Sequence, residues 1–99
     1  MSPFISVLEV RLHLGEVTDL KGKRKLLKSL KEQVRGRFGA TVAEIDGHDK
    51  WQRATLLCVL VGDGEVRDRA DALMRFVESR FPEGCSFERD TLSLEDIRG

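Results

Sequence analysis

The stretch from Leu20 to Phe38 limits most strongly how this chain can fold. Its apolar residues recur at spacings of three and four, which places them on one stripe of an α-helix. They are Leu27, Leu30, Val34 and Phe38. At about 100° per residue, six cations gather on the other side of that helix. They are Lys21, Arg24, Lys25, Lys28, Lys31 and Arg35. The sequence therefore predicts an amphipathic helix with a cationic outer face.

The charge of the chain is concentrated in this helix. From Lys21 to Arg37 there are eight basic residues and one acidic residue, Glu32, which gives a net charge of +7. The whole chain balances 17 basic against 17 acidic residues, so the remainder carries −7. A one-sided cationic helix is typical of a surface that binds phosphate groups. The alternative is a solvated helix whose charges are balanced by acids elsewhere, including those of a second helix.

Residues at the ends of the helix indicate where it begins and stops. Asp19 is a suitable N-cap, and Gly39 is the expected stop after Phe38. Lys23 falls inside the apolar arc, but near the helix end its ammonium group is expected to reach outward to solvent.

The other predicted elements are four strands and a second helix. Two strands alternate in polarity, one is apolar on both faces and should lie centrally in a sheet, and the last is mixed and should lie at an edge. Asp63 is expected to cap the second helix. In chain order these elements are strands 5–14, 41–46 and 54–62, helix 65–81, and strand 85–92.

The order β-α-β-β-α-β predicts an α+β fold, the ferredoxin-like sandwich. Right-handed crossovers then give a four-stranded antiparallel sheet with the first and third strands in the middle. Both helices cover one face of the sheet and leave the other face open. We expect a single domain over residues 1–99, with residues 93–99 as a polar tail.

The open face predicts an interface. Because the third strand is apolar on both faces, one alternate set must line the open face, either Leu56, Cys58 and Leu60 or Leu57, Val59 and Val61. We expect a two-fold homodimer with sheet facing sheet, surrounded by a polar rim of Glu9, Arg11, Glu44 and Arg53. The predicted interface residues are Val7, Val42, Leu57, Val59 and Trp51.

Composition limits the compartment and the cofactors. No apolar run reaches the roughly 20 residues that span a bilayer, and no secretion signal is visible at the N-terminus. Cys58 and Cys85 are far apart and are the only cysteines, which excludes a disulfide framework or a paired-cysteine zinc site. We expect a cytoplasmic protein without a membrane partner or a cofactor.

The connection before the third strand holds the residues that most resemble a reactive site. Asp46, His48, Asp49, Trp51 and Arg53 include acid, base and metal-ligand types. Hairpin loops collect such residues because backbone groups need partners there, so we predict neither catalysis nor a metal site. Arg53 is expected to form a cross-strand ion pair with Glu44 or Asp46.

Other modes of action leave different signatures. Base stacking on the sheet requires aromatic residues on the first and third strands, and neither strand has one. RNA contacts should therefore run through phosphates and shape. His13 stands alone on the open face and is expected to be a surface or interface residue, while Cys58 should lie in the core.

Two stretches resemble a known family. They are Leu20-Lys-Gly-Lys-Arg-Lys-Leu-Leu-Lys-Ser-Leu-Lys31 and Val42-Ala-Glu-Ile-Asp-Gly-His-Asp-Lys-Trp-Gln-Arg-Ala54. Both resemble the YlxP-like family of small bacterial domains of unknown function, and the resemblance covers nearly the full chain. It implies a ferredoxin-like fold and no established activity. Members of the family often lie beside genes for translation initiation and ribosome maturation, which associates them with RNA.

Two functional hypotheses follow. The first is a non-enzymatic accessory protein that binds RNA or a ribosomal particle through the six cations of helix 20–38. The second is a self-associating or protein-interaction module that uses the open sheet face. A small-molecule enzyme ranks behind both, because the sequence contains no phosphate-binding loop and no nucleophile motif.

Overall fold

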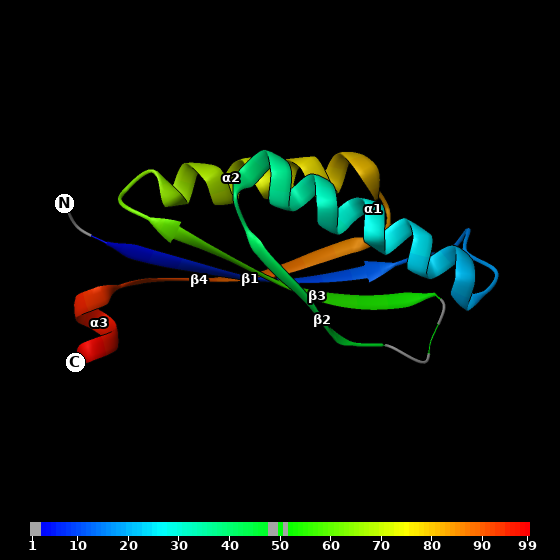
Figure 1. The fold of residues 1–99 in the computed structure, drawn as a ribbon, viewed down its shortest axis with the longest axis horizontal. Helices are drawn as coiled ribbons and strands as arrows, with labels where there is room; N and C mark the ends of the chain where they lie inside the picture. The colour runs from blue at the N-terminus through cyan, green and yellow to red at the C-terminus, as the bar shows by residue number, and fades with distance from the viewer. Residues whose placement is uncertain (1–2, 48–49, 51) are drawn as a thin grey trace.

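Strands and helices alternate along the chain as the sequence predicts. A computed structural model describes residues 3–47, 50 and 52–99. The elements are β1 (Phe4–His13), α1 (Leu20–Phe38), β2 (Thr41–Asp46), β3 (Arg53–Gly62), α2 (Val66–Arg80), β4 (Cys85–Ser93) and α3 (Leu94–Arg98). The fold class is α+β, with a four-stranded sheet and helices (Figure 1).

The sheet is antiparallel, with strand order β2-β3-β1-β4. As predicted, the first and third strands lie in the middle and β4 lies at an edge. β1 and β3 pair along their whole length, from Phe4 opposite Gly62 to His13 opposite Arg53. This central pair lies beneath α2, while α1 packs beside it against β2.

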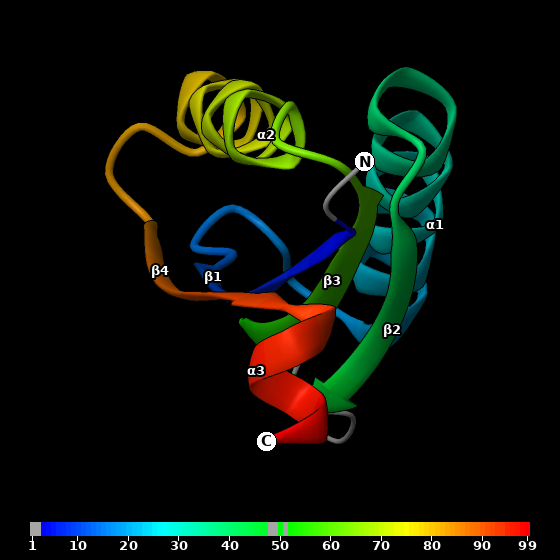
Figure 2. The ribbon, with the colours of Figure 1, turned by 90° about the vertical axis from the view of Figure 1, so that its left-hand side faces the viewer.

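Helices α1 and α2 cover the same face of the sheet (Figures 1 and 2). α1 lies over the β2 side, and α2 lies over β1, β3 and β4. The core fills the space between the layers, because alternate residues of the central strands point toward the helices. Its members include Leu8, Val10, Leu56, Cys58, Leu60, Leu27, Leu30, Val34, Leu73 and Val77.

Strand register decides which residues line the open face, the side of the sheet away from α1 and α2. On β3, Cys58 and its alternate neighbours are buried toward the helices, so Leu57, Val59 and Val61 line the open face. The sequence analysis placed Val42 on the open face, and this prediction was wrong. Val42 pairs with Cys58, and opposed residues share a face, so it is buried in the core, while Thr41 and Ala43 take the open side.

The caps of α1 confirm its predicted bounds. The Asp19 carboxylate accepts from the Gly22 backbone N–H at 2.7 Å. Gly39 adopts φ 66°, and its N–H donates to the Arg35 carbonyl oxygen, which ends the helix. The expected cap of α2 is different, because Glu65 is the N-cap residue and has no side-chain cap bond. The Asp63 carboxylate instead accepts from the Glu65 N–H at 3.2 Å.

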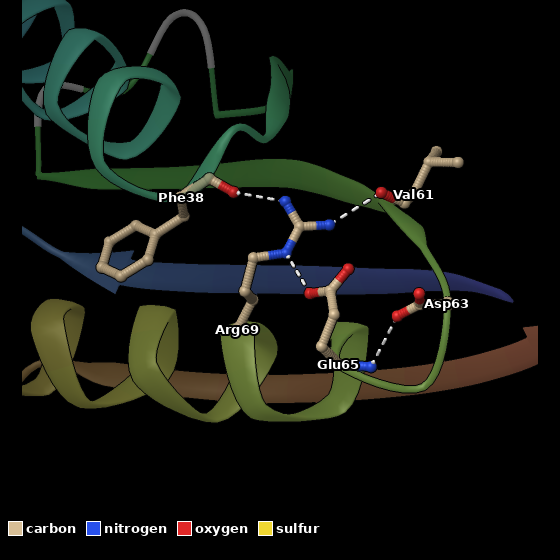
Figure 3. A network of polar contacts seen from close by, with 5 residues as sticks. All are labelled: Phe38, Val61, Asp63, Glu65 and Arg69. Atoms are coloured by element: carbon tan, nitrogen blue, oxygen red, sulfur yellow. Dashed lines mark hydrogen bonds and ion pairs between the residues drawn. The ribbon is translucent and has the colours of Figure 1, made fainter.

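One arginine of α2 connects the ends of three elements (Figure 3). The Arg69 guanidinium donates to the Phe38 carbonyl oxygen at the end of α1 at 3.0 Å and to that of Val61 at the end of β3 at 2.7 Å. Its Nε donates to the Glu65 carboxylate at 2.8 Å. Arg69 therefore fixes the C-terminal end of α1 relative to the sheet.

The predicted polar tail contains a short helix. Ser93 and Asp96 form a capping box, in which the Ser93 hydroxyl accepts from the Asp96 N–H at 3.0 Å and the Asp96 carboxylate accepts from the Ser93 N–H at 2.9 Å. The resulting helix α3 lies on the open-face side of the sheet, opposite α1 and α2 (Figures 1 and 2). Among the described residues, no helix is long and apolar enough to cross a membrane.

Candidate nucleic-acid interface on helix α1

The geometry of α1 separates a buried edge from a charged surface. Leu27, Leu30 and Val34 are buried against the sheet, as their spacing predicts. The helix has 19 residues and is about 28 Å long at about 1.5 Å per residue. The six predicted cations, Lys21, Arg24, Lys25, Lys28, Lys31 and Arg35, form what we term the basic stripe.

Four cations of the basic stripe are open to solvent. Lys21, Arg24, Lys25 and Lys28 are exposed, and none of them forms an ion pair with any residue that the structure describes. Two acids at the second helix pair with other residues, since Glu65 pairs with Arg69 and Asp71 pairs with Arg89, and neither Asp68 nor Glu78 forms an ion pair with the stripe. The stripe thus keeps its charge available for a ligand.

The other two cations lie closer to the sheet. The Arg35 guanidinium donates to the Val42 carbonyl oxygen on β2 at 2.9 Å. Lys31 is half-buried and lines a groove between α1 and β2, together with Arg24, Lys28 and Glu44. The stripe therefore leans over the β2 edge of the sheet, and Arg35 has a structural contact in addition to its charge.

The prediction that the Lys23 ammonium group reaches solvent was wrong. Its ammonium group does not reach solvent, because the residue is only 2% exposed. It donates to the carbonyl oxygens of Gly47 and Lys50, the latter at 2.7 Å. Glu44 Oε2 lies 3.2 Å from its Nζ and accepts no hydrogen bond from the described residues, so this contact is an ion pair. Lys23 thus holds the β2–β3 connection against α1.

Part of the β2–β3 connection can be compared with its prediction. Asp46 accepts from the Gly47 N–H at 2.8 Å, a local turn contact. The expected ion pair of Arg53 was wrong, because among the described residues Arg53 pairs with neither Glu44 nor Asp46. Glu44 lies opposite Leu56 and its carboxylate turns to Lys23. Glu44 therefore does not belong to a rim of the open face. His48, Asp49 and Trp51 lie outside the described residues.

Two further observations concern metal-ligand and thiol side chains. Within residues 3–47, 50 and 52–99, no group of three or more His, Cys, Asp or Glu side chains could hold a metal ion. Cys58 lies in the core as predicted, and burial raises the pKa of its thiol to about 11, partly opposed by the charge of Arg35. The thiol stays protonated at neutral pH and is a poor nucleophile.

His13 and Arg11 lie on the open face. His13 is exposed and pairs across the strands with Arg53. The Arg11 guanidinium contacts the carboxylates of Glu9 at 2.7 Å and Glu88 at 3.6 Å. This face thus carries both signs of charge, unlike the basic stripe.

Comparison with known proteins places the chain in a family. The family described as "Protein of unknown function (DUF503)" matches residues 5–86, which include both longer helices and reach the start of β4. The chain belongs to this family. It is also 28% identical over 81 residues to the uncharacterized protein YlxP of Bacillus subtilis (strain 168), which covers 80% of this chain and 87% of that protein.

The DUF503 match covers the basic stripe and the contacts of Lys23, but α3 lies beyond it. Sequence reasoning missed the role of Lys23, although its place in the apolar arc of α1 was a signal that its ammonium group needed a buried partner. The partners could not be predicted, because two of them are backbone carbonyl groups brought in by the turn of the β2–β3 connection.

Proposed function

We propose that this DUF503 protein is a non-enzymatic accessory protein that binds RNA, alone or within a ribosomal particle, through the basic stripe. The observation that carries the proposal is the exposure of four unpaired cations on one helix, judged over the described residues. A solvated helix gains nothing from four unpaired cations on one side, because like charges repel one another. A phosphate backbone relieves this repulsion by replacing it with attraction and by releasing counterions.

The groove between α1 and β2 provides a path for the backbone. Arg24, Lys28 and Lys31 line it, and successive members of this row are one turn of the helix apart, about 5.4 Å. Glu44, the acid in the groove, is already paired with Lys23 and repels a phosphate less than a free carboxylate does. We therefore expect the RNA to run along α1 beside the β2 edge.

The proposed contacts are made to the phosphate groups of the RNA and not to its bases. β1 and β3 have no aromatic residue on the open face, and that face carries the acids Glu9, Glu88 and Asp90. The ferredoxin-like assignment of the fold is part of this proposal and is supported by the central β1–β3 pair and by two helices on one face. Sequence-independent binding with a strong dependence on salt is the expected behaviour.

A salt series with paired variants tests the proposal. For single-stranded RNA, the slope of log K against log salt concentration is about −0.7 per neutralised phosphate, so four contacts predict a slope near −3. The double substitution Lys25→Glu and Lys28→Glu should abolish measurable binding of a poly(U) RNA while shifting stability by only about 0.5 kcal/mol. Fluorescence anisotropy measures the affinity for RNA, and thermal unfolding measures the stability of the variant.

The matched control reverses two exposed arginines away from α1, Arg75→Glu and Arg98→Glu. It changes the net charge of the protein by the same amount and should keep most of the affinity for poly(U). The proposal fails if the Lys25 and Lys28 variant binds RNA as the unmodified protein does, or if both double variants lose binding equally.

A further inference from the structure

The contact between α1 and α2 gathers positive charge at a second place, apart from the basic stripe. The guanidinium carbon of Arg37 lies 4.5 Å from the centre of the Phe76 ring, and that of Arg80 lies 5.1 Å from the same centre. Phe76 is only 9% exposed, whereas both arginines are exposed. We term Gln33, Arg37, Phe76 and Arg80 the helix junction. Residues from two helices thus hold two like charges close together over one ring.

Contacts within the chain position these charges without neutralising them. Neither Arg37 nor Arg80 forms an ion pair with any residue that the structure describes. Arg80 instead donates to the Gln33 amide oxygen at 2.6 Å, and the Gln33 amide nitrogen donates to the Ser29 hydroxyl at 2.9 Å. A guanidinium that lies over an aromatic ring keeps its charge and has N–H groups left to donate. The helix junction therefore presents an arginine pair with donors for an anion.

The acids around α2 leave this charge in place. At about 100° per residue, Asp71 and Glu78 lie on the opposite side of α2 from Phe76, and Asp71 pairs with Arg89 of β4. Glu83, in the turn after α2, lines the groove beyond Arg80 and forms no ion pair with it. A phosphate group is therefore expected on the Arg37 side of Arg80.

α1 separates the helix junction from the basic stripe. Lys31 and Arg35 of the stripe lie toward β2, since Lys31 lines the groove between α1 and β2 and Arg35 donates to a β2 carbonyl oxygen. Arg37 lies toward α2. The C-terminal half of α1 thus has cations on both flanks, and a helix with its side chains is about 10 to 12 Å across. The exposed ridge between the flanks carries Glu32, the only acid of α1.

We propose that the RNA is double-stranded, and that α1 lies along its minor groove with one strand on the basic stripe and the other on the helix junction. The inference rests on the proposed function. Phosphates of two strands reach both flanks at once, whereas a single strand that crosses between the flanks passes over Glu32 and is repelled. The minor groove of duplex RNA is wide and shallow and displays 2′-hydroxyl groups, which can donate to the Glu32 carboxylate.

Two RNAs and one double variant test the proposal. A labelled RNA duplex of about 16 base pairs, the length that double-stranded-RNA-binding domains span, is compared with poly(U) by fluorescence anisotropy at several salt concentrations. The unmodified protein should bind the duplex at least about tenfold more tightly, because more phosphates are neutralised. Arg37→Gln with Arg80→Gln should remove that advantage and change the affinity for poly(U) less than about twofold. For the duplex, the slope of log K against log salt should become less steep by about 2, at about 0.9 per lost phosphate contact.

Two further double variants separate charge from packing. Arg37→Lys with Arg80→Lys keeps both charges and should keep the preference for the duplex and its salt slope. Arg75→Gln with Arg98→Gln removes the same charge from exposed positions outside the helix junction and should also keep the preference. Equal binding of duplex and poly(U) by the unmodified protein overturns the proposal. A glutamine variant that keeps the preference, or a lysine variant that loses it, overturns it as well.

These outcomes differ from a failure of the basic stripe. If Lys25→Glu with Lys28→Glu leaves the binding of both RNAs unchanged, the stripe is not the RNA site. If that variant loses both RNAs while the Arg37 and Arg80 glutamine variant keeps the preference for the duplex, the stripe stands and the assignment of double-stranded RNA falls.

Discussion

At the scale of single residues, Lys23 shows how a charged side chain can act as a core residue. It lies among the apolar positions of α1, where its ammonium group contacts two carbonyl oxygens and the Glu44 carboxylate. A buried charge is tolerated only when such partners are present. The contacts connect α1 to the β2–β3 connection, so this lysine contributes to the shape of the groove and not to its free charge.

Replacing Lys23 therefore should destabilise the fold strongly. We expect Lys23→Met to lower the free energy of unfolding by about 3 kcal/mol, because it leaves a mostly buried carboxylate and two carbonyl groups without their partner. Lys25→Met, on the exposed side, should change it by less than about 0.5 kcal/mol. Urea unfolding measures both. If the pair is as coupled as its 3.2 Å separation implies, Glu44→Gln should recover part of the loss in a double-mutant cycle.

Cys58 gives a prediction for alkaline pH. Burial raises the pKa of its thiol from 9.0 to about 11 in the folded chain. Below pH 9 the thiol is protonated in both states and adds no pH dependence. Between pH 9 and about 11 the unfolded chain loses this proton while the folded chain keeps it, so the free energy of unfolding falls as pH rises, by up to about 1.4 kcal/mol per pH unit.

The measurement compares unfolding of the unmodified protein and Cys58→Ala at several pH values from 8 to 11. The variant is less stable at every pH because of its cavity, but its curve should fall less steeply above pH 9. The other thiol, Cys85, is present in both proteins, so its contribution cancels in the comparison. If the free energies of unfolding of the two proteins fall in parallel above pH 9, the raised pKa of the Cys58 thiol is contradicted.

At the scale of elements, Arg69 fixes how α1 meets the sheet. Its planar guanidinium reaches the Phe38 and Val61 carbonyl oxygens at the same time (Figure 3). Lysine carries a single ammonium group and cannot reproduce this fork. We expect Arg69→Lys to lower the free energy of unfolding by about 1 to 2 kcal/mol, from two weakened hydrogen bonds. Arg75→Lys on the exposed side of α2 is the control, and an equal loss there argues against a specific role for Arg69.

Elements with strong local signals were predictable from the sequence. α1 and β2 have the predicted bounds, and for α1 the reason is that Asp19 and Gly39 supply the cap chemistry at its ends. The sequence analysis did not predict α3, because the segment is short and lacks an apolar stripe. The signal for it was the spacing of Ser93 and Asp96, which form a capping box. The face of Val42 was not predictable, since β2 mixes polar and apolar residues and only its pairing with Cys58 decides which side is buried.

At the scale of the whole molecule, the basic stripe and the apolar row of β3 on the open face lie on opposite sides of the sheet. The basic stripe belongs to the layer of α1 and α2 (Figure 2), and Leu57, Val59 and Val61 of β3 belong to the open face. The sequence predicted both surfaces because charge and hydrophobicity are local properties, whereas their opposite placement follows from the topology of the sheet.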